Sequence, residues 1–335
     1  MSGRPAAVVT GGAGFIGSHA VDHLVEIGYS VRVIDNLTGG HESNLSRHRS
    51  DDLVDLVQAD VRSLERGHPA FHGAELVLHF AGIGDIVPSI EQPTEYMDVN
   101  AQGTVRVLEC ARDSRVGKVV YAASSSCYGL AQTPTTEDAP IDTRYPYALS
   151  KYLGEQAVLH WNQVYGLPVN CIRIFNAYGP RVRTTGAYGA VFGVFLRQKL
   201  AGAPLTVVGD GTQARDFVYV TDVARAFVLA AQRGIPGRVF NLGAGNPQTI
   251  NRLVELIGGN VVYVPRRPGE PELTWADTTR IRTELGWAPL VSFEDGVRAM
   301  LEDIGSWVNA PLWNPETIAE ATRTWFEYLS DEEDP

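Results

Sequence analysis

The sequence predicts an α/β protein with a doubly wound parallel sheet and a smaller mixed α/β domain in its C-terminal half. Two observations lead to this prediction. Short apolar runs alternate with longer amphipathic stretches in the first half of the chain, as in parallel strands joined by crossover helices. After Gly179-Pro180 this alternation loosens, and glycine and proline become more frequent. The expected strands are Ala6–Thr10, Ser30–Asp35, Leu53–Gln58, Leu76–Phe80, Lys118–Ala122 and Val169–Ile174.

Two later segments can return to the first sheet. Arg215–Gln232 has the pattern of a strand followed by a helix, and Val239–Leu242 that of a further strand. The first domain would then comprise residues 1–176 and about 216–242, and the second residues 177–215 and 243–335.

The chain closes with a segment that predicts one amphipathic helix. This helix would span Pro315–Leu329 and bury Trp325, Phe326 and Leu329, with a frayed acidic tail behind it. Trp307, Trp313 and Trp325 all lie in this closing segment, where core or dimer packing is their default explanation.

Composition excludes several classes of function. The formal net charge of −11 would repel a nucleic-acid backbone, and no basic run compensates for it. No apolar stretch approaches the ~20 residues of a membrane span, and no export signal precedes the first strand, so we expect a soluble protein. Cys110, Cys127 and Cys171 lack the paired spacing of disulfides or thiolate metal sites, which favours the reducing cytoplasm. His19 and His23 have the spacing of a helical zinc pair, but without a third ligand we expect no metal.

A glycine-rich loop directly after the first strand is the candidate phosphate site. It runs Gly11-Gly12-Ala13-Gly14-Phe15-Ile16-Gly17 and opens an amphipathic helix. Glycines let the backbone turn sharply and approach a pyrophosphate, which is stabilised at the positive end of the helix. The pattern alone is weak, because a glycine-rich turn without a ligand has the same sequence.

The context of the loop makes a dinucleotide more probable than an empty turn. Asp35 ends the second strand about 20 residues on, where a carboxylate accepts both ribose hydroxyls and repels a 2′-phosphate, which favours NAD over NADP. Asp60 follows the third strand and either meets the adenine edge or is an ordinary exposed turn residue. His79-Phe80-Ala81-Gly82 ends the fourth strand with small residues that leave space beside a cofactor.

Tyr147 and Lys151 are the candidate reacting groups, one helical turn apart on one face. This spacing often arises by chance on solvated helices. The segment Ser124-Ser125-Ser126 favours a functional role for Tyr147 and Lys151. It ends the fifth strand, and ligands of open α/β sheets bind at the carboxyl ends of strands. A free tyrosine titrates near pH ~10, so a nearby ammonium and a positive nicotinamide would be needed to favour the phenolate.

These residues resemble those of the extended short-chain dehydrogenases that act on nucleotide sugars, a family with a Rossmann-type fold, and within it the UDP-glucose/UDP-N-acetylglucosamine 4-epimerases. The resemblance implies catalysis by Ser124, Tyr147 and Lys151, with Ser126 beside them. It implies NAD as cofactor, held by Gly11, Gly14, Phe15, Ile16, Gly17, Asp35, Asn36, Asp60, Val61, Phe80, Ala81, Gly82, Asn100, Tyr147 and Lys151.

The same resemblance marks a nucleotide-sugar site in the second half. Arg215 and Arg267 would pair with the two phosphates, and Glu270 would hold the nucleoside ribose, although each arginine alone could be an ordinary surface ion pair. The implied substrate-binding residues are Ser89, Ser124, Ser125, Asn176, Val191, Val208, Arg215, Arg267, Glu270 and Thr274.

The resemblance covers several reactions on nucleotide sugars, and the serine segment distinguishes among them. Members that eliminate water carry acids in the serine segment, and decarboxylases carry a glutamate there; this chain has Ser125 and Ser126, which favours 4-epimerisation. Another sugar-nucleotide chemistry and, more distantly, a non-catalytic NAD-binding regulator remain alternatives. Thr274 falls where a bulky residue would exclude an N-acetyl group, so N-acetylated hexoses are expected substrates, and Gly84 fits the N-acetylhexosamine types. The family also implies a homodimer through Val99–Ala111 and Tyr147–Tyr165.

Overall fold

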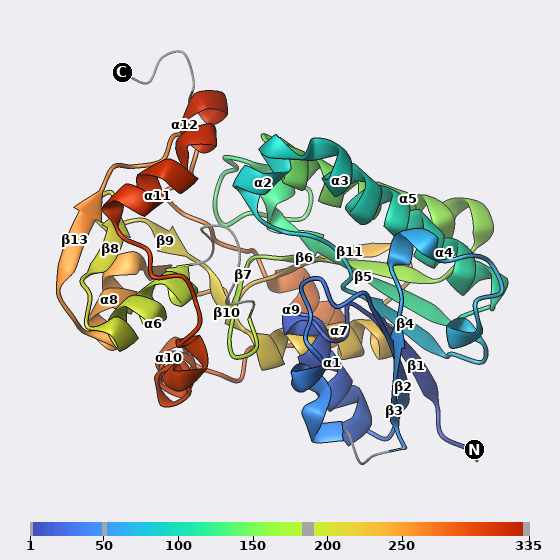
Figure 1. The fold of residues 1–335 in the computed structure, drawn as a ribbon. Coiled ribbons are helices and arrows are strands. Elements are labelled where there is room, and N and C mark those ends of the chain that lie inside the picture. Colours follow the sequence, from blue (N-terminus) through green and yellow to red (C-terminus); the bar gives the residue numbers. More distant parts are fainter. Residues whose placement is uncertain (1–2, 49–51, 183–190, 331–335) are drawn as a thin grey trace.

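The computed structural model describes residues 3–48, 52–182 and 191–330. Its centre is a seven-stranded sheet in which every neighbouring pair is parallel, in the order β11-β6-β5-β4-β1-β2-β3. The predicted doubly wound α/β fold is therefore confirmed (Figure 1). The strands are β1 Ala6–Thr10, β2 Ser30–Asp35, β3 Val54–Gln58, β4 Leu76–His79, β5 Lys118–Ser124, β6 Val169–Ile174 and β11 Arg238–Leu242.

Helices cover both faces of this sheet, which explains why its central strands are mostly apolar instead of alternating between apolar and polar residues. The helices α1 (Phe15–Glu26) and α7 (Val220–Arg233) share one hydrophobic core on one face. The helices α4 (Gly103–Asp113) and α5 (Pro146–Tyr165) contribute to a second core on the other face. Every residue of β4 and β6 is buried as a result.

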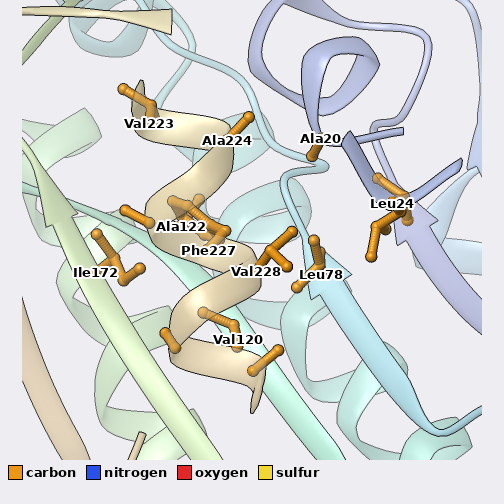
Figure 2. Packing of buried hydrophobic residues seen from close by; sticks show 14 of the residues in the cluster. Ala20, Leu24, Leu78, Val120, Ala122, Ile172, Val223, Ala224, Phe227 and Val228 are labelled. Carbon is orange, nitrogen blue, oxygen red and sulfur yellow. The ribbon is translucent and has the colours of Figure 1, made fainter. Parts of the chain in front are cut away.

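Figure 2 shows the packing of α7 on the sheet. Phe227 and Val228 of α7 lie beside the strand residues Leu78 and Val120. Leu24 of α1 lies beyond Leu78 in the same core. Fully burying one such side chain stabilises a fold by about 1.5–3 kcal/mol, so this face fixes α7 firmly against β4 and β5.

The remaining elements form the mixed α/β part of the chain. It contains three strand pairs: β8 (Leu205–Val208) with β13 (Val261–Val264), β7 (Asn176–Tyr178) with β10 (Phe217–Tyr219), and β9 (Ala214–Arg215) with β12 (Gln248–Thr249). Only the last pair is antiparallel. A third core packs there around α6 (Val191–Ala201), α8 (Ile250–Ile257) and α10 (Phe293–Glu302).

The remaining α-helices of the described chain are α2 Ile86–Glu91, α3 Pro93–Met97, α9 Thr279–Leu285, α11 Pro315–Ala321 and α12 Arg323–Leu329.

Two sequence predictions about these elements were wrong in part. The strand expected at the start of Arg215–Gln232 does not join the central sheet, because β11 already occupies the edge beyond β6, and β10 pairs with β7 instead. The single helix expected over Pro315–Leu329 is two helices that meet at Thr322, whose hydroxyl donates to the carbonyl of Ile318 at 2.8 Å. Such a back-bond competes with the helical pattern and bends the chain.

The bend also changes which residues the end of the chain buries. Trp325 is buried as expected, whereas Phe326 is 37% exposed. The acidic tail expected after the helix falls on residues 331–335, which lie outside the described residues. Within the described residues, no helix has both the length and the apolar character that a membrane span needs.

A buried ion pair joins α5 to β6 beneath the carboxyl ends of the strands. Arg173 Nη2 and Nε contact the two carboxylate oxygens of Glu155 at 2.6 and 2.8 Å. The hydroxyl of Tyr128 lies 2.6 Å from Arg173 Nη1 and donates to Asn241 Oδ1 at 2.7 Å. Both charges are therefore hydrogen-bonded, which is the condition for burying them.

We predict that Glu155→Ala lowers the free energy of unfolding by about 3–5 kcal/mol, because it leaves the Arg173 charge buried without its partner. The double variant Glu155→Leu with Arg173→Met should recover most of this loss, since it removes both charges. Denaturant unfolding of the three proteins measures the effect. A loss below about 1 kcal/mol in the single variant would contradict the burial of this pair.

Candidate active site

A cleft of about 970 Å³ opens at the carboxyl ends of β1, β4 and β5 and extends to the mixed part of the chain. Its lining includes the glycine loop, the serine segment, Tyr147 and Lys151 on one side. On the other side it includes Asn176, Arg215, Glu270 and Thr274. Parallel strands bring loops that are distant in sequence to one edge of the sheet, where ligands of such folds bind.

The glycine loop forms a cradle that side chains would fill. Gly11 has a φ of +69°, and a Cβ there would lie 2.6 Å from the backbone nitrogen of Ala81. A Cβ on Gly17 would overlap the carbonyl oxygen of Gly11. Gly14 precedes α1 without a side-chain cap, so the first amides of the helix face the cleft lining unshielded. This arrangement fits the pyrophosphate of a dinucleotide.

Asp35 links this cradle to the second strand. One of its carboxylate oxygens accepts from the backbone N–H of Ala13 at 3.0 Å, and the other accepts from that of Leu37 at 2.8 Å. The carboxylate is nearly buried yet lines the cleft, where a ribose would meet it. Asp60 also lines the cleft and accepts from Asn36 Nδ2 at 3.1 Å. Hydrogen bonds from Arg62 lower the pKa of Asp60 to about 2, so it is ionised.

Phe80, Ala81 and Gly82 form the floor beside β4, as the sequence indicated. Asn100 lies behind this floor and is fully buried. Its amide pairs with both backbone groups of Ile83, at 2.9 and 3.0 Å, and donates to Ser150 Oγ at 2.9 Å. Asn100 thus braces the floor against α5. It sits in a π-helical turn, Asp98–Gln102, a deviation often found at functional sites.

Tyr147 faces the end of β5. It is the second residue of α5, and its hydroxyl donates to Ser124 Oγ at 3.4 Å. Its ring is held by Tyr145, stacked at 6.5 Å, and by Tyr96, edge-on at 6.3 Å. Ser124 is also the N-cap of a short 3₁₀ helix, Ser125–Tyr128, and its Oγ accepts from the N–H of Ser126. The phenol and the serine hydroxyl therefore have fixed positions on one wall of the cleft.

Lys151 lies one helical turn beyond Tyr147 and is buried. Its ammonium is 4.4 Å from the centre of the Tyr121 ring, a cation–π contact, and a Cβ on Gly82 would lie 3.6 Å from it. Burial lowers the pKa of Lys151 to about 7. Burial likewise raises the pKa of Tyr147, against the lowering hydrogen bond to Ser124. From the sequence we expected a lowered pKa for the Tyr147 phenol. The chain's own groups do not lower it, so further positive charge is needed at the site.

On the opposite wall Glu270 joins the guanidinium group of Arg215 to that of Arg267, which lies behind the lining. Glu270 accepts from Arg215 Nη2 at 2.7 Å and pairs with Arg267 Nε at 3.0 Å. Thr274 accepts from the N–H of Asp216 at 3.2 Å and donates to Asn176 Oδ1 at 2.8 Å. Because the amide oxygen of Asn176 is taken up in this way, its NH₂ group is left to face the cleft.

Most of the predicted site residues line this one cleft. Five do not: Ser89, whose hydroxyl donates to the carbonyl of Ile86 at 2.6 Å, and Asn100, Val191, Val208 and Arg267. Their binding roles stay predictions. His19, which shares with His23 the spacing of a zinc pair, contacts the carbonyl of Pro180 at 3.2 Å. Within the described ranges no group of three or more metal-ligating side chains is assembled.

Sequence analysis missed part of the lining. Arg144 and Tyr145 precede α5 and line the cleft, as do Trp307, Trp313 and Trp325. The three tryptophans were assigned to core or dimer packing, and Trp307 does pack in the third core. Three tryptophans close to the chain end are unusual and could have indicated a role in the cleft. No local pattern, however, shows which surface a tryptophan covers.

We predict that the wild-type protein, with its cleft kept free of dinucleotide, gains stability as pH rises above about 7, by at most ~1.4 kcal/mol per pH unit. The reason is that unfolded Lys151 binds a proton up to pH 10.5, whereas the folded residue loses it near pH 7. Lys151→Met should remove this dependence. Denaturant unfolding at about pH 7 and 8.5 measures it, and equal pH slopes in both proteins would contradict the lowered pKa.

The comparisons with known proteins agree with this geometry. Residues 7–243 match the model of the "NAD dependent epimerase/dehydratase family". A UDP-glucose 4-epimerase of Mycolicibacterium smegmatis is 36% identical over 304 residues, which are 88% of this chain and 97% of that protein.

Solved structures are similar over almost the same length. The UDP-glucose 4-epimerase of Thermotoga maritima with UDP-glucose has a TM-score of 0.83 at 34% identity, covering 90% of this chain and 99% of that one. The UDP-glucuronic acid 4-epimerase of Bacillus cereus, with UDP-glucuronic acid and NAD, has a TM-score of 0.84 at 28% identity, covering 90% and 99%.

Relatives with other reactions are similar too. They include a UDP-N-acetyl-alpha-D-glucosaminuronate decarboxylase of Bacillus cytotoxicus at 30% identity and a dTDP-glucose 4,6-dehydratase of Streptomyces niveus at 32%. The predicted use of NAD is confirmed at the level of the family, and the glycine cradle and Asp35 fit that cofactor. The chain is an enzyme of the NAD-dependent epimerase/dehydratase family.

Proposed function

We propose that this enzyme epimerises a UDP-linked hexose at C4 through a 4-keto intermediate. One observation carries the proposal: a single phenol, Tyr147, lies 3.4 Å from the Ser124 hydroxyl, and the two residues that follow Ser124 are serines. Dehydration or decarboxylation would need additional acids in that segment, and a serine hydroxyl does not act as an acid or base at neutral pH without a partner.

The protein's own groups have distinct parts in this reaction. NAD, when bound in the glycine cradle beside Asp35, would supply the hydride chemistry at C4 of the sugar. Tyr147 takes the proton of the C4 hydroxyl and gives it back, while Ser124 hydrogen-bonds the same oxygen. A protonated Lys151 would add to the positive charge that the phenol needs, although burial keeps the pKa of Tyr147 raised in the protein alone. If the 4-keto sugar rotates in the cleft so that its other face receives the hydride, the same phenol can act again and no second acid–base group is needed.

The opposite wall is suited to the rest of the substrate. Arg215 and Arg267 supply permanent positive charge for a diphosphate. Glu270 lies between them. Once the phosphates bind the two guanidinium groups in its place, its carboxylate can accept a hydrogen bond from a ribose hydroxyl. The Asn176 amide is oriented by Thr274 toward the same part of the cleft. The similar UDP-sugar enzymes support UDP as the nucleotide.

We predict that the purified enzyme converts UDP-glucose to UDP-galactose without added NAD, because the cofactor is regenerated in each cycle. Tyr147→Phe should keep its NAD and lose nearly all turnover, since general acid–base groups contribute about 10²–10⁴-fold. Product chromatography and the nucleotide content of the denatured protein measure both. Full activity of the variant would refute the proton-transfer role. Accumulation of NADH would favour another sugar-nucleotide reaction, and bound NAD without any turnover would favour a regulator.

We further predict that UDP-N-acetylglucosamine is a substrate, because Thr274 is small and lines the cleft. Thr274→Tyr should lose this activity while keeping that on UDP-glucose. Thr274→Gly is the matched variant that leaves the space open. If wild type and Thr274→Gly both reject the N-acetylated sugar, Thr274 is not the residue that selects it. Ratios of kcat/KM for the two sugars measure the preference.

A homodimer through α4 and α5 is the proposed assembly. One exposed face of α5 carries Leu149, Leu153 and Val164, each more than a third exposed. Apolar side chains on one helix face favour a partner surface. Light scattering of the protein, with Leu153→Glu as the disrupting variant, tests this assembly.

A further inference from the structure

The helix α12 contacts both sides of the cleft. It packs against α2, which belongs to the loop region after β4 (Figure 1). Thr324 Oγ1 of α12 donates to Glu91 Oε1 of α2 at 3.0 Å. The end of the chain therefore bridges the dinucleotide side of the cleft and the side that carries Arg215 and Glu270.

Trp325 is the residue of α12 that reaches inward. Its side chain is 7% exposed and lines the cleft. The indole Nε1 donates to the carbonyl of Pro268 at 2.7 Å, and the guanidinium carbon of Arg267 lies 5.3 Å from the centre of its ring. The Tyr145 ring is 6.5 Å away on another side.

These contacts restrain the loop that carries Arg267 and Glu270. A hydrogen bond holds its backbone at Pro268, and the indole face covers the Arg267 side chain, leaving Nε to pair with Glu270 at 3.0 Å. Glu270 in turn pairs with Arg215 at 2.7 Å. All three charged side chains are at least three-quarters shielded from solvent, so their mutual positions matter more than those of exposed ion pairs. The orientation of both guanidinium groups thus depends on Trp325.

We propose that Trp325 is a positioning residue of the substrate site, which holds Arg267 and, through Glu270, Arg215 in the orientation that binds the diphosphate of the substrate. It acts through these arginines and does not itself carry the reaction. The proposal rests on the proposed function only in requiring a nucleoside diphosphate group.

A purely structural role for Trp325 makes a different prediction. If the indole only fills space, its loss lowers stability and affects every ligand alike. If it positions the arginines, its loss weakens diphosphate binding and raises KM, while NAD content and kcat change little, because the glycine cradle lies on other elements.

The test is calorimetric titration of the holoenzyme with UDP, dTDP and GDP, using the diphosphate that wild type binds most tightly. We expect Trp325→Ala to bind it about tenfold more weakly, and Trp325→Phe, which keeps an aromatic face but loses the bond to Pro268, about threefold more weakly. Tyr328→Ala removes an aromatic ring from the same helix at a 64% exposed position and should bind as wild type does. Equal affinity of wild type and Trp325→Ala would overturn the proposal.

A double-mutant cycle shows whether Trp325 acts through Arg267. Once Arg267→Ala has been made, adding Trp325→Ala should weaken binding little further, because residues that act as one unit are non-additive. Losses that multiply would overturn the proposal, and so would a fall in NAD content equal to the loss of diphosphate affinity. Trp325→Phe keeps the test usable should the alanine variant unfold. Binding is read without turnover, so a failure of 4-epimerisation leaves this result intact.

Discussion

The buried ammonium of Lys151 is the feature on which the arrangement of the active site depends. Its charge has no bulk water, and the carboxylate nearest along the same helix face, Glu155, gives both oxygens to Arg173. Glu155 still favours the charged form of Lys151 through space, and the ammonium contacts the face of Tyr121. Holding a positive charge in this way is costly to the fold, and burial accordingly lowers the pKa of Lys151 to about 7.

The cleft joins two sets of groups with opposite chemistry. The ends of β1, β2, β4 and β5 present backbone amides, hydroxyls and small residues, which suit a dinucleotide and a reacting alcohol. The mixed part presents arginines, with Glu270 between them. Neither set forms a site by itself, and the C-terminal helix α12 contacts both. This explains why residues near the end of the chain belong to the cleft.

Much of this protein could be predicted before its structure was known. The central strands are buried on both faces, so they are continuous apolar runs, and their ends were correct to within about two residues. The glycine loop and Tyr147 with Lys151 were found because their spacing is set locally, by a tight turn and by one turn of a helix. The segment after Tyr178 was harder, because short strands that pair with distant partners leave no periodic pattern.

The sequence by itself determined most of the order of strands and helices, the glycine cradle and the spacing of Tyr147 and Lys151 on one helix, since these follow from local backbone preference and periodicity. Only the tertiary structure decided that β10 leaves the central sheet, that Thr322 divides the last helix, and that Trp325 faces Arg267. Such outcomes depend on which edge is already occupied and which side chain reaches across a cleft. Those are distances between residues far apart in the chain, and no local pattern encodes them.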